Sequence, residues 1–443
     1  MRVMRSQVAK LTNRPFVRNV LVVATGTAMA QIIYMALSPI ITRLYGPEAY
    51  GLMGAFMAIV LIISPVAALT YPIAIVLPKQ VEDARSLMIL SFLISAASSI
   101  FLILILLMFY QEIVDLFHLN TLSPFLLLLP AVVLFSGSLQ IAEGWLIRTK
   151  QFKVTAKVAV LHALILQGSM VLVGLLYAEA AVLIVLSVLA IMIRSALMFK
   201  LSQKPLRLQL EFGLERRIEL KKTAIRYKDF PVYRAPEVFI DAISLGLPVL
   251  LLASFFGPAA AGFYSIGYTV LLIPSQLIGK SVGDVFYPRI SDAANNGENM
   301  SELIKKATYY LAGAGVLPYV IVIAFGPALF SFVFGTEWVV AGEYARWIAL
   351  WSFFKFLNKP SMTALPALSA QAFNLYSTII TLIVRIVALA IGYYTFESDL
   401  IAIALFSITG AALNIVFIFM TLNISKKHDL RNKQFDFRKG MGE

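Results

Sequence analysis

The chain has no cysteine and only three histidines, and it carries 24 acidic side chains against 37 Lys and Arg. The absence of cysteine excludes disulfides, thiolate metal sites and cysteine nucleophiles. His118, His162 and His428 lie too far apart along the chain to predict a metal cluster. A Gly-rich phosphate loop ending in Lys and Ser/Thr is also missing, so we do not expect ATP hydrolysis. The sequence therefore predicts neither an enzyme, nor a cofactor, nor a metal site.

Long uncharged runs are abundant, and hydrophobic residues make up 60% of the chain. Tyr50–Pro78, Ser86–Gln111 and Leu400–Ser425 carry no charge, and each exceeds the roughly 20 residues that a membrane-spanning helix needs. These runs predict an all-α, polytopic membrane protein. Breaks in hydrophobicity predict about twelve spans, at 17–43, 50–77, 86–110, 121–147, 155–177, 180–202, 233–256, 260–286, 307–334, 338–358, 369–394 and 398–424.

Basic residues are confined to alternate gaps between these spans. All but five of the 37 lie in the N-terminus, the even-numbered gaps or the C-terminal tail; the five others are Arg43, Arg194, Lys280, Arg346 and Arg385. Because positive loops stay in the cytoplasm, the pattern predicts that both termini are cytoplasmic. The net charge of +13 then faces anionic lipid, and we expect no nucleic-acid partner.

A single long polar segment divides the spans six and six. Apolar and charged residues interleave over Lys204–Tyr233, which predicts an amphipathic helix on the inner leaflet. The predicted organisation is a basic N-terminus at 1–16, an N-lobe at 17–202, the linker at 203–232, a C-lobe at 233–425 and a basic tail at 426–443.

The two halves repeat a Gly-Pro turn. Gly46–Gly51 follows the first span and Gly257–Gly262 the seventh, and each precedes an apolar helix that we expect to be interrupted, at Pro65 and Pro274 respectively. Six spans per half give the repeats the same orientation, and transporters often place their substrate path between such repeats. Alternatively, each Gly-Pro pair only makes a local tight turn.

Five segments resemble the Wzx-type polysaccharide (O-antigen) flippases of the multidrug/oligosaccharidyl-lipid/polysaccharide exporter superfamily. They are Ser38–Pro47, Tyr227–Arg234, Leu247–Leu252, Phe255–Pro258 and Phe334–Gly342. The resemblance implies a MATE-like bundle of twelve helices in two lobes, in the cytoplasmic membrane of a bacterium. It implies a substrate, an undecaprenyl-diphosphate-linked oligosaccharide, that moves from the inner to the outer leaflet for O-antigen, capsule or exopolysaccharide synthesis. A polysaccharide polymerase and chain-length machinery are the further partners that it suggests.

Polar residues recur on one face of four predicted spans. Ionisable groups inside a membrane are functional candidates by default. The members that ionise or carry amides are Arg18, Gln31 and Tyr34 in the first span, Arg234, Glu237 and Asp241 in the seventh, Gln276, Lys280 and Asp284 in the eighth, and Gln371, Asn374 and Arg385 in the eleventh. Such faces line protein or a wet cavity. For the neutral residues we favour hydrogen bonding between helices, and for Arg234, Lys280, Arg346 and Arg385 we favour a cavity.

The cations form two sets by depth, and we expect both to bind substrate. Arg18, Arg234 and Lys280 lie toward the cytoplasmic ends of their spans, where they would capture a diphosphate. Arg346 and Arg385 lie in the outer halves, where they would receive it. Arg suits phosphate because its planar fork makes two parallel hydrogen bonds. In the alternative, Arg234 with Glu237 and Lys280 with Asp284 only neutralise each other. Glu143 and Arg194 are either structural or titrate in coupling to H⁺ or Na⁺.

Three other functions fit the sequence less well. A small-molecule or drug antiporter of the same superfamily would need a surplus of acid for cationic substrates, whereas basic side chains outnumber acids in the deep spans. A membrane-embedded polymerase or ligase of surface sugars is disfavoured by the short outer gaps. An ion channel fits less well than a transporter with the six-plus-six repeat.

Overall fold

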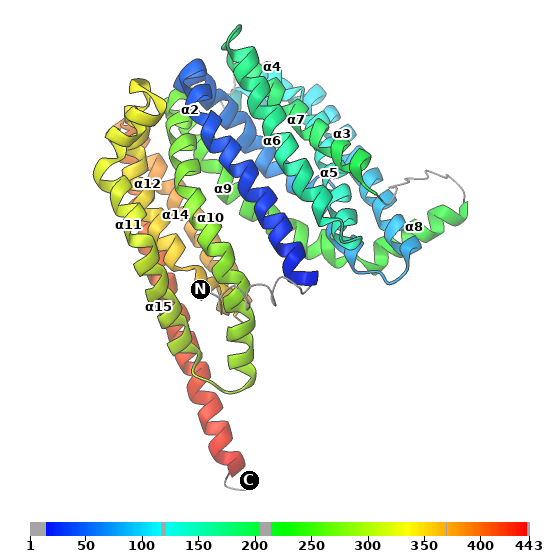
Figure 1. The fold of residues 1–443 in the computed structure, drawn as a ribbon, viewed down its shortest axis with the longest axis vertical. Coiled ribbons are helices and arrows are strands. Elements are labelled where there is room, and N and C mark those ends of the chain that lie inside the picture. The colour runs from blue at the N-terminus through cyan, green and yellow to red at the C-terminus, as the bar shows by residue number, and fades with distance from the viewer. Residues whose placement is uncertain (1–14, 117–120, 204–213, 369, 441–443) are drawn as a thin grey trace, which may run out of the picture. The chain divides into compact units, whose positions relative to one another are not determined.

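The computed structural model describes residues 15–116, 121–203, 214–368 and 370–440, and these ranges contain helices and turns but no strand (Figure 1). The predicted all-α class is confirmed. The chain divides into two compact units, residues 1–250 and 251–443. The boundaries of the two predicted lobes, including the linker at 203–232, stay a prediction.

The first unit contains α2 to α8 and most of α9. Its α-helices are α2 (Pro15–Ile63), α3 (Val81–Leu116), α4 (Ser123–Leu126), α5 (Leu129–Arg148), α6 (Phe152–Gly174), α7 (Ala180–Leu201), α8 (Leu214–Arg226) and α9 (Ala235–Phe256). Two 3₁₀ segments, η1 (Ser64–Val66) and η2 (Tyr71–Val76), follow α2, and a π-helical turn, η3 (Phe230–Arg234), precedes α9. Within the unit, α2 packs on α6 and α7, and α5 packs on α3 and α7.

The second unit contains the remaining helices. They are α10 (Pro258–Asn295), α11 (Met300–Phe334), the 3₁₀ turn η4 (Thr336–Trp338), α12 (Val339–Leu357), α13 (Lys359–Ala364), α14 (Gln371–Phe396) and α15 (Asp399–Gly440). Here α12 packs on α10, α11 and α15, and α14 packs on α15.

Nine helices within the described ranges are long and apolar enough to cross a membrane, so the chain is a multi-pass membrane protein. The predicted count of twelve is higher for three reasons. The stretch Val22–Val66 counts once among the nine, although it contains the first two predicted spans on either side of a break at Gly46. The described apolar part of α10, Pro258–Leu272, is too short by itself to be counted as a span. Finally, α12 carries Glu343, Arg346 and Lys355 within 19 residues. The number twelve therefore stays a prediction.

Glycine conformation distinguishes the two repeated turns from ordinary helix. Gly46 has φ 69° and ψ 174° and breaks α2 in two, while Gly257 has φ 90° and ψ 172° and immediately precedes α10. Only glycine adopts this combination readily, and in both cases proline follows. Pro65 falls where α2 gives way to η1, as expected. The predicted interruption at Pro274 is wrong, because α10 continues to Asn295; a proline removes one helical hydrogen bond, and a long helix can tolerate this as a kink.

The predicted linker is helical at Leu214–Arg226, and residues 204–213 lie outside the described ranges. This helix, α8, packs on α3. Ser86 donates a hydrogen bond to Glu219, Arg226 pairs with Asp83 at 3.2 Å, and Tyr71 donates to the carbonyl of Ala224 at 3.1 Å. Polar contacts therefore hold α8 against α3 and η2 within the first unit.

Candidate functional site

Arg234 stands at the junction of η3 and α9, and its guanidinium pairs with Glu237 at 2.8 Å. The two side chains are 49% and 54% exposed. The hydroxyl of Thr70 donates to the carbonyl of Phe230 at 3.0 Å and fixes the start of η3. Asp241 lies one turn beyond Glu237 and is also exposed. The ion pair between Arg234 and Glu237 is therefore present, and the guanidinium of Arg234 remains accessible.

Arg346 is exposed on α12, where its Nε donates to the carbonyl of Ile323 at 2.7 Å. The neighbouring helices approach closely here, because Cβ atoms added at Gly326 or Gly342 would lie 2.5 Å from the carbonyl oxygen of the other glycine. Small residues at such contacts are typical of membrane helices. Arg346 thus bonds to α11 while its guanidinium stays accessible.

Three of the predicted site side chains lie outside the described residues: Arg18, Lys280 and Asp284. Two neutral candidates are described. Gln31 is half-buried on α2. Asn374 is half-buried on α14, and its side-chain oxygen has no hydrogen-bond partner.

A polar cluster lies among four helices of the first unit. Glu143 on α5 forms a 2.8 Å ion pair with Arg194 on α7. His162 on α6 lies within reach of the Arg194 charge, bonds to the backbone of Ala190, and contacts the Tyr34 hydroxyl of α2 through its Nδ1 at 3.2 Å. Glu143 and Arg194 are predicted from the sequence as structural or ion-coupling groups, and Tyr34 as part of the polar face of the first span. His162 is not predicted at this site, because only the packing of α2 on α6 brings it beside Tyr34. No group of three or more potential metal ligands occurs among the described residues.

The second unit holds Arg385 in an aromatic cluster. Arg385 on α14 is 9% exposed, and its guanidinium carbon lies 4.2 Å from the ring centroid of Trp351 and 4.9 Å from that of Phe406. Tyr268 stacks on Trp351, and Tyr264 stacks on Tyr268, with 5.8 Å between ring centroids in each pair. Sequence reasoning missed these rings because aromatic residues in apolar spans look like ordinary packing.

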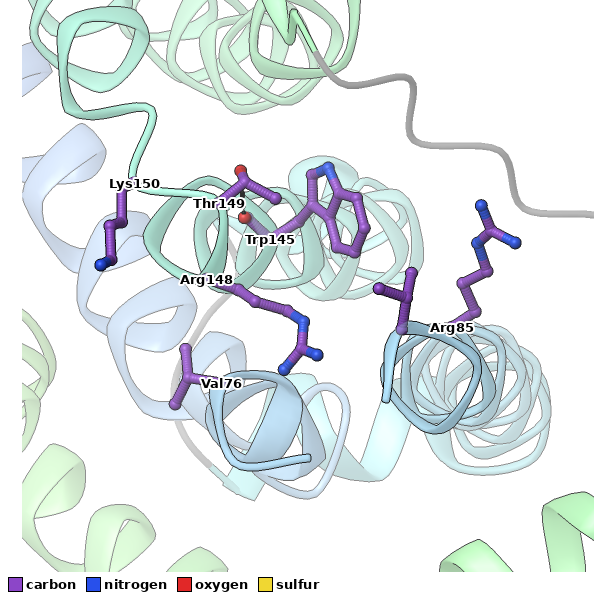
Figure 2. A pocket seen from close by; sticks show the side chains of 7 residues that line it. Val76, Arg85, Trp145, Arg148, Thr149 and Lys150 are labelled. Atoms are coloured by element: carbon purple, nitrogen blue, oxygen red, sulfur yellow. Dashed lines mark hydrogen bonds between the residues drawn. The ribbon is translucent and has the colours of Figure 1, made fainter. Parts of the chain in front are cut away.

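A cavity of about 560 Å³ opens beside α5 in the first unit (Figure 2). It contains none of the predicted site residues; its lining is Val76, Val81, Arg85, Trp145, Arg148, Thr149 and Lys150. Arg148 donates to the carbonyls of Ile75, Pro78, Lys79 and Gln80 at 2.6–3.4 Å. These bonds give Arg148 a structural role, because they fasten the turn between η2 and α3.

Solved structures show where else this fold occurs. An inward-facing multidrug resistance MATE family transporter of the MOP superfamily is 11% identical, with a TM-score of 0.70, and the match covers 94% of this chain and 99% of that one. The lipid II flippase MurJ in an inward closed conformation is 13% identical, with a TM-score of 0.71 and coverage of 96% and 93%. The Vibrio cholerae MATE transporter VcmN is 13% identical, with a TM-score of 0.52 and coverage of 95% and 98%. At these identities the likeness shows the fold alone, and it confirms the predicted MATE-like architecture.

Sequence similarity identifies the family of the chain. No curated protein matches the chain. A family described as polysaccharide biosynthesis protein matches residues 40–343, which is more than half of the chain and includes most of the segments that carried the predicted resemblance. The chain therefore belongs to the polysaccharide biosynthesis protein family.

Proposed function

We propose that this protein is a flippase that moves an undecaprenyl-diphosphate-linked oligosaccharide from the inner to the outer leaflet of a bacterial cytoplasmic membrane by alternating access. The observation that carries the proposal is family membership over residues 40–343 on a fold shared with the lipid II flippase MurJ. The shared fold supports a transport function, and the family supports a polysaccharide precursor as the class of substrate. In this proposal the products are surface polysaccharides, and a polymerase and chain-length machinery act on the unit after it arrives.

A diphosphate needs fixed positive charge in place of the water that it loses on entering a membrane protein. Arg234 and Arg346 are the candidates whose side chains are described and exposed. Arg18 and Lys280 complete the proposed binding set. Arg234 has Glu237 as a resident counter-ion at 2.8 Å, and an arriving phosphate would compete with that carboxylate for the guanidinium. Arg385, also in the proposed binding set, lies instead against the rings of Trp351 and Phe406.

The Glu143–Arg194 pair and the neighbouring His162 give the first unit a set of ionisable groups inside its spans. We propose that this cluster, with H⁺ or Na⁺ as the ion, couples transport to a gradient. Movement of a charged lipid head group needs an energy source, and the chain carries no ATP-binding loop. Glu237, Asp241, Asp284, Gln31 and Asn374 are the remaining polar groups proposed to line the path or to contribute to coupling.

The second candidate is a small-molecule antiporter, because the fold is equally that of multidrug MATE transporters. Deleting the gene separates the two. A flippase predicts loss of surface polysaccharide with accumulation of the lipid-linked unit on the inner leaflet, both restored by the intact gene. An antiporter predicts normal polysaccharide and altered sensitivity to cationic drugs, and that result would overturn the proposal.

A further inference from the structure

The cavity of about 560 Å³ beside α5 is basic, and the proposed transport function does not use it. None of the residues proposed to bind the cargo or to couple its movement lines it. Three of its lining residues are cations: Arg85 of α3, Arg148 at the end of α5, and Lys150 just after that end. In Figure 2, Arg148 lies in the middle of the lining, with Arg85 on one side and Lys150 on the other.

The lining carries this positive charge without an acidic partner. Within the described ranges, no carboxylate forms an ion pair with any of the three cations. Glu82 and Asp83 belong to the first turn of α3, but neither lines the cavity, and Asp83 pairs with Arg226 at 3.2 Å. The cavity therefore favours an anionic ligand.

Two of the cations are available to bind such a ligand. Arg148 donates to four backbone carbonyls, so it contributes a fixed charge. Arg85 and Lys150 are exposed, and their side chains make no hydrogen bond or ion pair with the described residues. The planar fork of Arg and the mobile ammonium of Lys both suit phosphate oxygens.

The surroundings of the cavity indicate the depth of a lipid head group. Val81 and Arg85 line it from the first turns of α3, and the amphipathic helix α8 packs on α3 at the same end, through Arg226 and Asp83. Such helices lie at the boundary between head groups and acyl chains. Val76 and Val81 also line the cavity and are 40% and 42% exposed, so apolar surface adjoins the cations.

We propose that this cavity binds the phosphate of an anionic phospholipid, with Arg85 and Lys150 as the donors. A soluble phosphate has the same charge, but the apolar side chains of the lining favour a ligand with acyl chains. The predicted orientation puts this end of the unit in the cytoplasm, so the lipid belongs to the inner leaflet. A head group held by both donors joins α3 to the turn between α5 and α6. This inference does not depend on the proposed cargo, because it uses none of the cargo-binding residues.

The test titrates the purified full-length protein in a neutral detergent with phosphatidylglycerol, or with phosphatidylcholine that has the same acyl chains. A ligand that binds only the folded state raises its stability in a saturable way. We expect phosphatidylglycerol to raise the melting temperature by about 2–4 °C more than phosphatidylcholine at saturation. The double variant Arg85→Gln, Lys150→Gly should lose this difference. Glycine is used at position 150 because the residue there has φ 56°, which glycine adopts without strain.

A matched control distinguishes this site from general attraction to a basic protein. Lys426→Gln with Lys427→Gln removes two exposed cations from α15 in the second unit and should retain the difference between the lipids. Glycerol 3-phosphate should not reproduce the shift; an equal shift would make the ligand a soluble anion and overturn the lipid assignment. Full retention of the lipid difference by the Arg85 and Lys150 variant would also overturn the proposal.

Tryptophan fluorescence gives a readout that does not depend on unfolding. Trp145 lines the cavity, so phosphatidylglycerol brominated on its acyl chains should quench the wild-type emission more than brominated phosphatidylcholine does. Trp145→Phe should remove that excess. If phosphatidylglycerol and phosphatidylcholine act equally on the wild-type protein in both assays, the proposal is wrong, and this comparison decides the matter even if a variant does not fold.

Discussion

Glu143 and Arg194 form a 2.8 Å ion pair that links α5 to α7 within two spans. Each side chain is 36% exposed in the protein alone, and in a bilayer the surroundings of such a pair exclude much of the water. In this setting the intact ion pair adds little net stability. Removing one partner is costly, because it leaves the other partner as an uncompensated charge.

Single and double substitutions of this pair should therefore differ. We expect Glu143→Gln and Arg194→Gln each to lower the free energy of unfolding by about 1–3 kcal/mol. The double variant should lose less than the sum of the two. Thermal unfolding in detergent measures all three variants, and strictly additive losses would show that the two charges do not interact.

The repeated turns predict a matched pair of glycine effects. Gly46→Ala and Gly257→Ala should each destabilise the protein by about 1–3 kcal/mol, because alanine is strained at their positive φ. Gly168→Ala and Gly313→Ala are the controls, since an added Cβ meets nothing within 4 Å at either position and each lies inside a helix. The controls should be neutral or stabilising by roughly 0.5–1 kcal/mol. Equal effects at all four positions would contradict the special role of the two turns.

Asp429 provides a third test, because its buried carboxylate accepts hydrogen bonds from the backbone N–H groups of Met300 and Ser301 at 3.0 Å each. A carboxylate at a helix N-terminus satisfies free donors and complements the helix dipole. Asp429→Ala should speed amide hydrogen exchange in the first turn of α11 and destabilise the second unit by about 1–2 kcal/mol. Unchanged exchange there would remove the capping role from Asp429, and Asp292→Ala, at an exposed site, is the control.

The orientation of the chain in the membrane is predicted from the Lys and Arg residues in alternate gaps between the spans. Reporter fusions at Glu443 and within residues 111–120 should report opposite sides of the membrane, with Glu443 in the cytoplasm. Reporters that agree with each other would overturn the predicted topology.

Hydrophobicity was sufficient to predict the class and the positions of the helices, because spanning segments are long and locally encoded. Contacts between residues that lie far apart in the sequence could not be predicted from hydrophobicity. The Tyr34–His162 contact joins residues 128 apart, and the aromatic cluster around Arg385 gathers side chains from α10, α12, α14 and α15. The stripe pattern selected Arg385 as a candidate, but it did not predict the aromatic rings of Trp351 and Phe406 beside it. The expected break at Pro274 failed for a related reason, since local sequence does not show whether packing carries a helix past a proline.

We propose that this protein moves lipid-linked diphosphate sugars and that Arg234 captures them. The most direct measurement reconstitutes the purified protein in liposomes with an undecaprenyl-diphosphate oligosaccharide and follows its exposure to a membrane-impermeant glycosidase. We expect protein-dependent transfer between leaflets, slowed about tenfold or more by Arg234→Ala because a charge-assisted hydrogen bond to phosphate is lost. Arg234→Lys should be intermediate, because it keeps the positive charge but loses the planar fork. Absence of transfer by the wild-type protein would contradict the claim, and equal rates for Arg234→Ala and the wild type would refute the assigned role of Arg234.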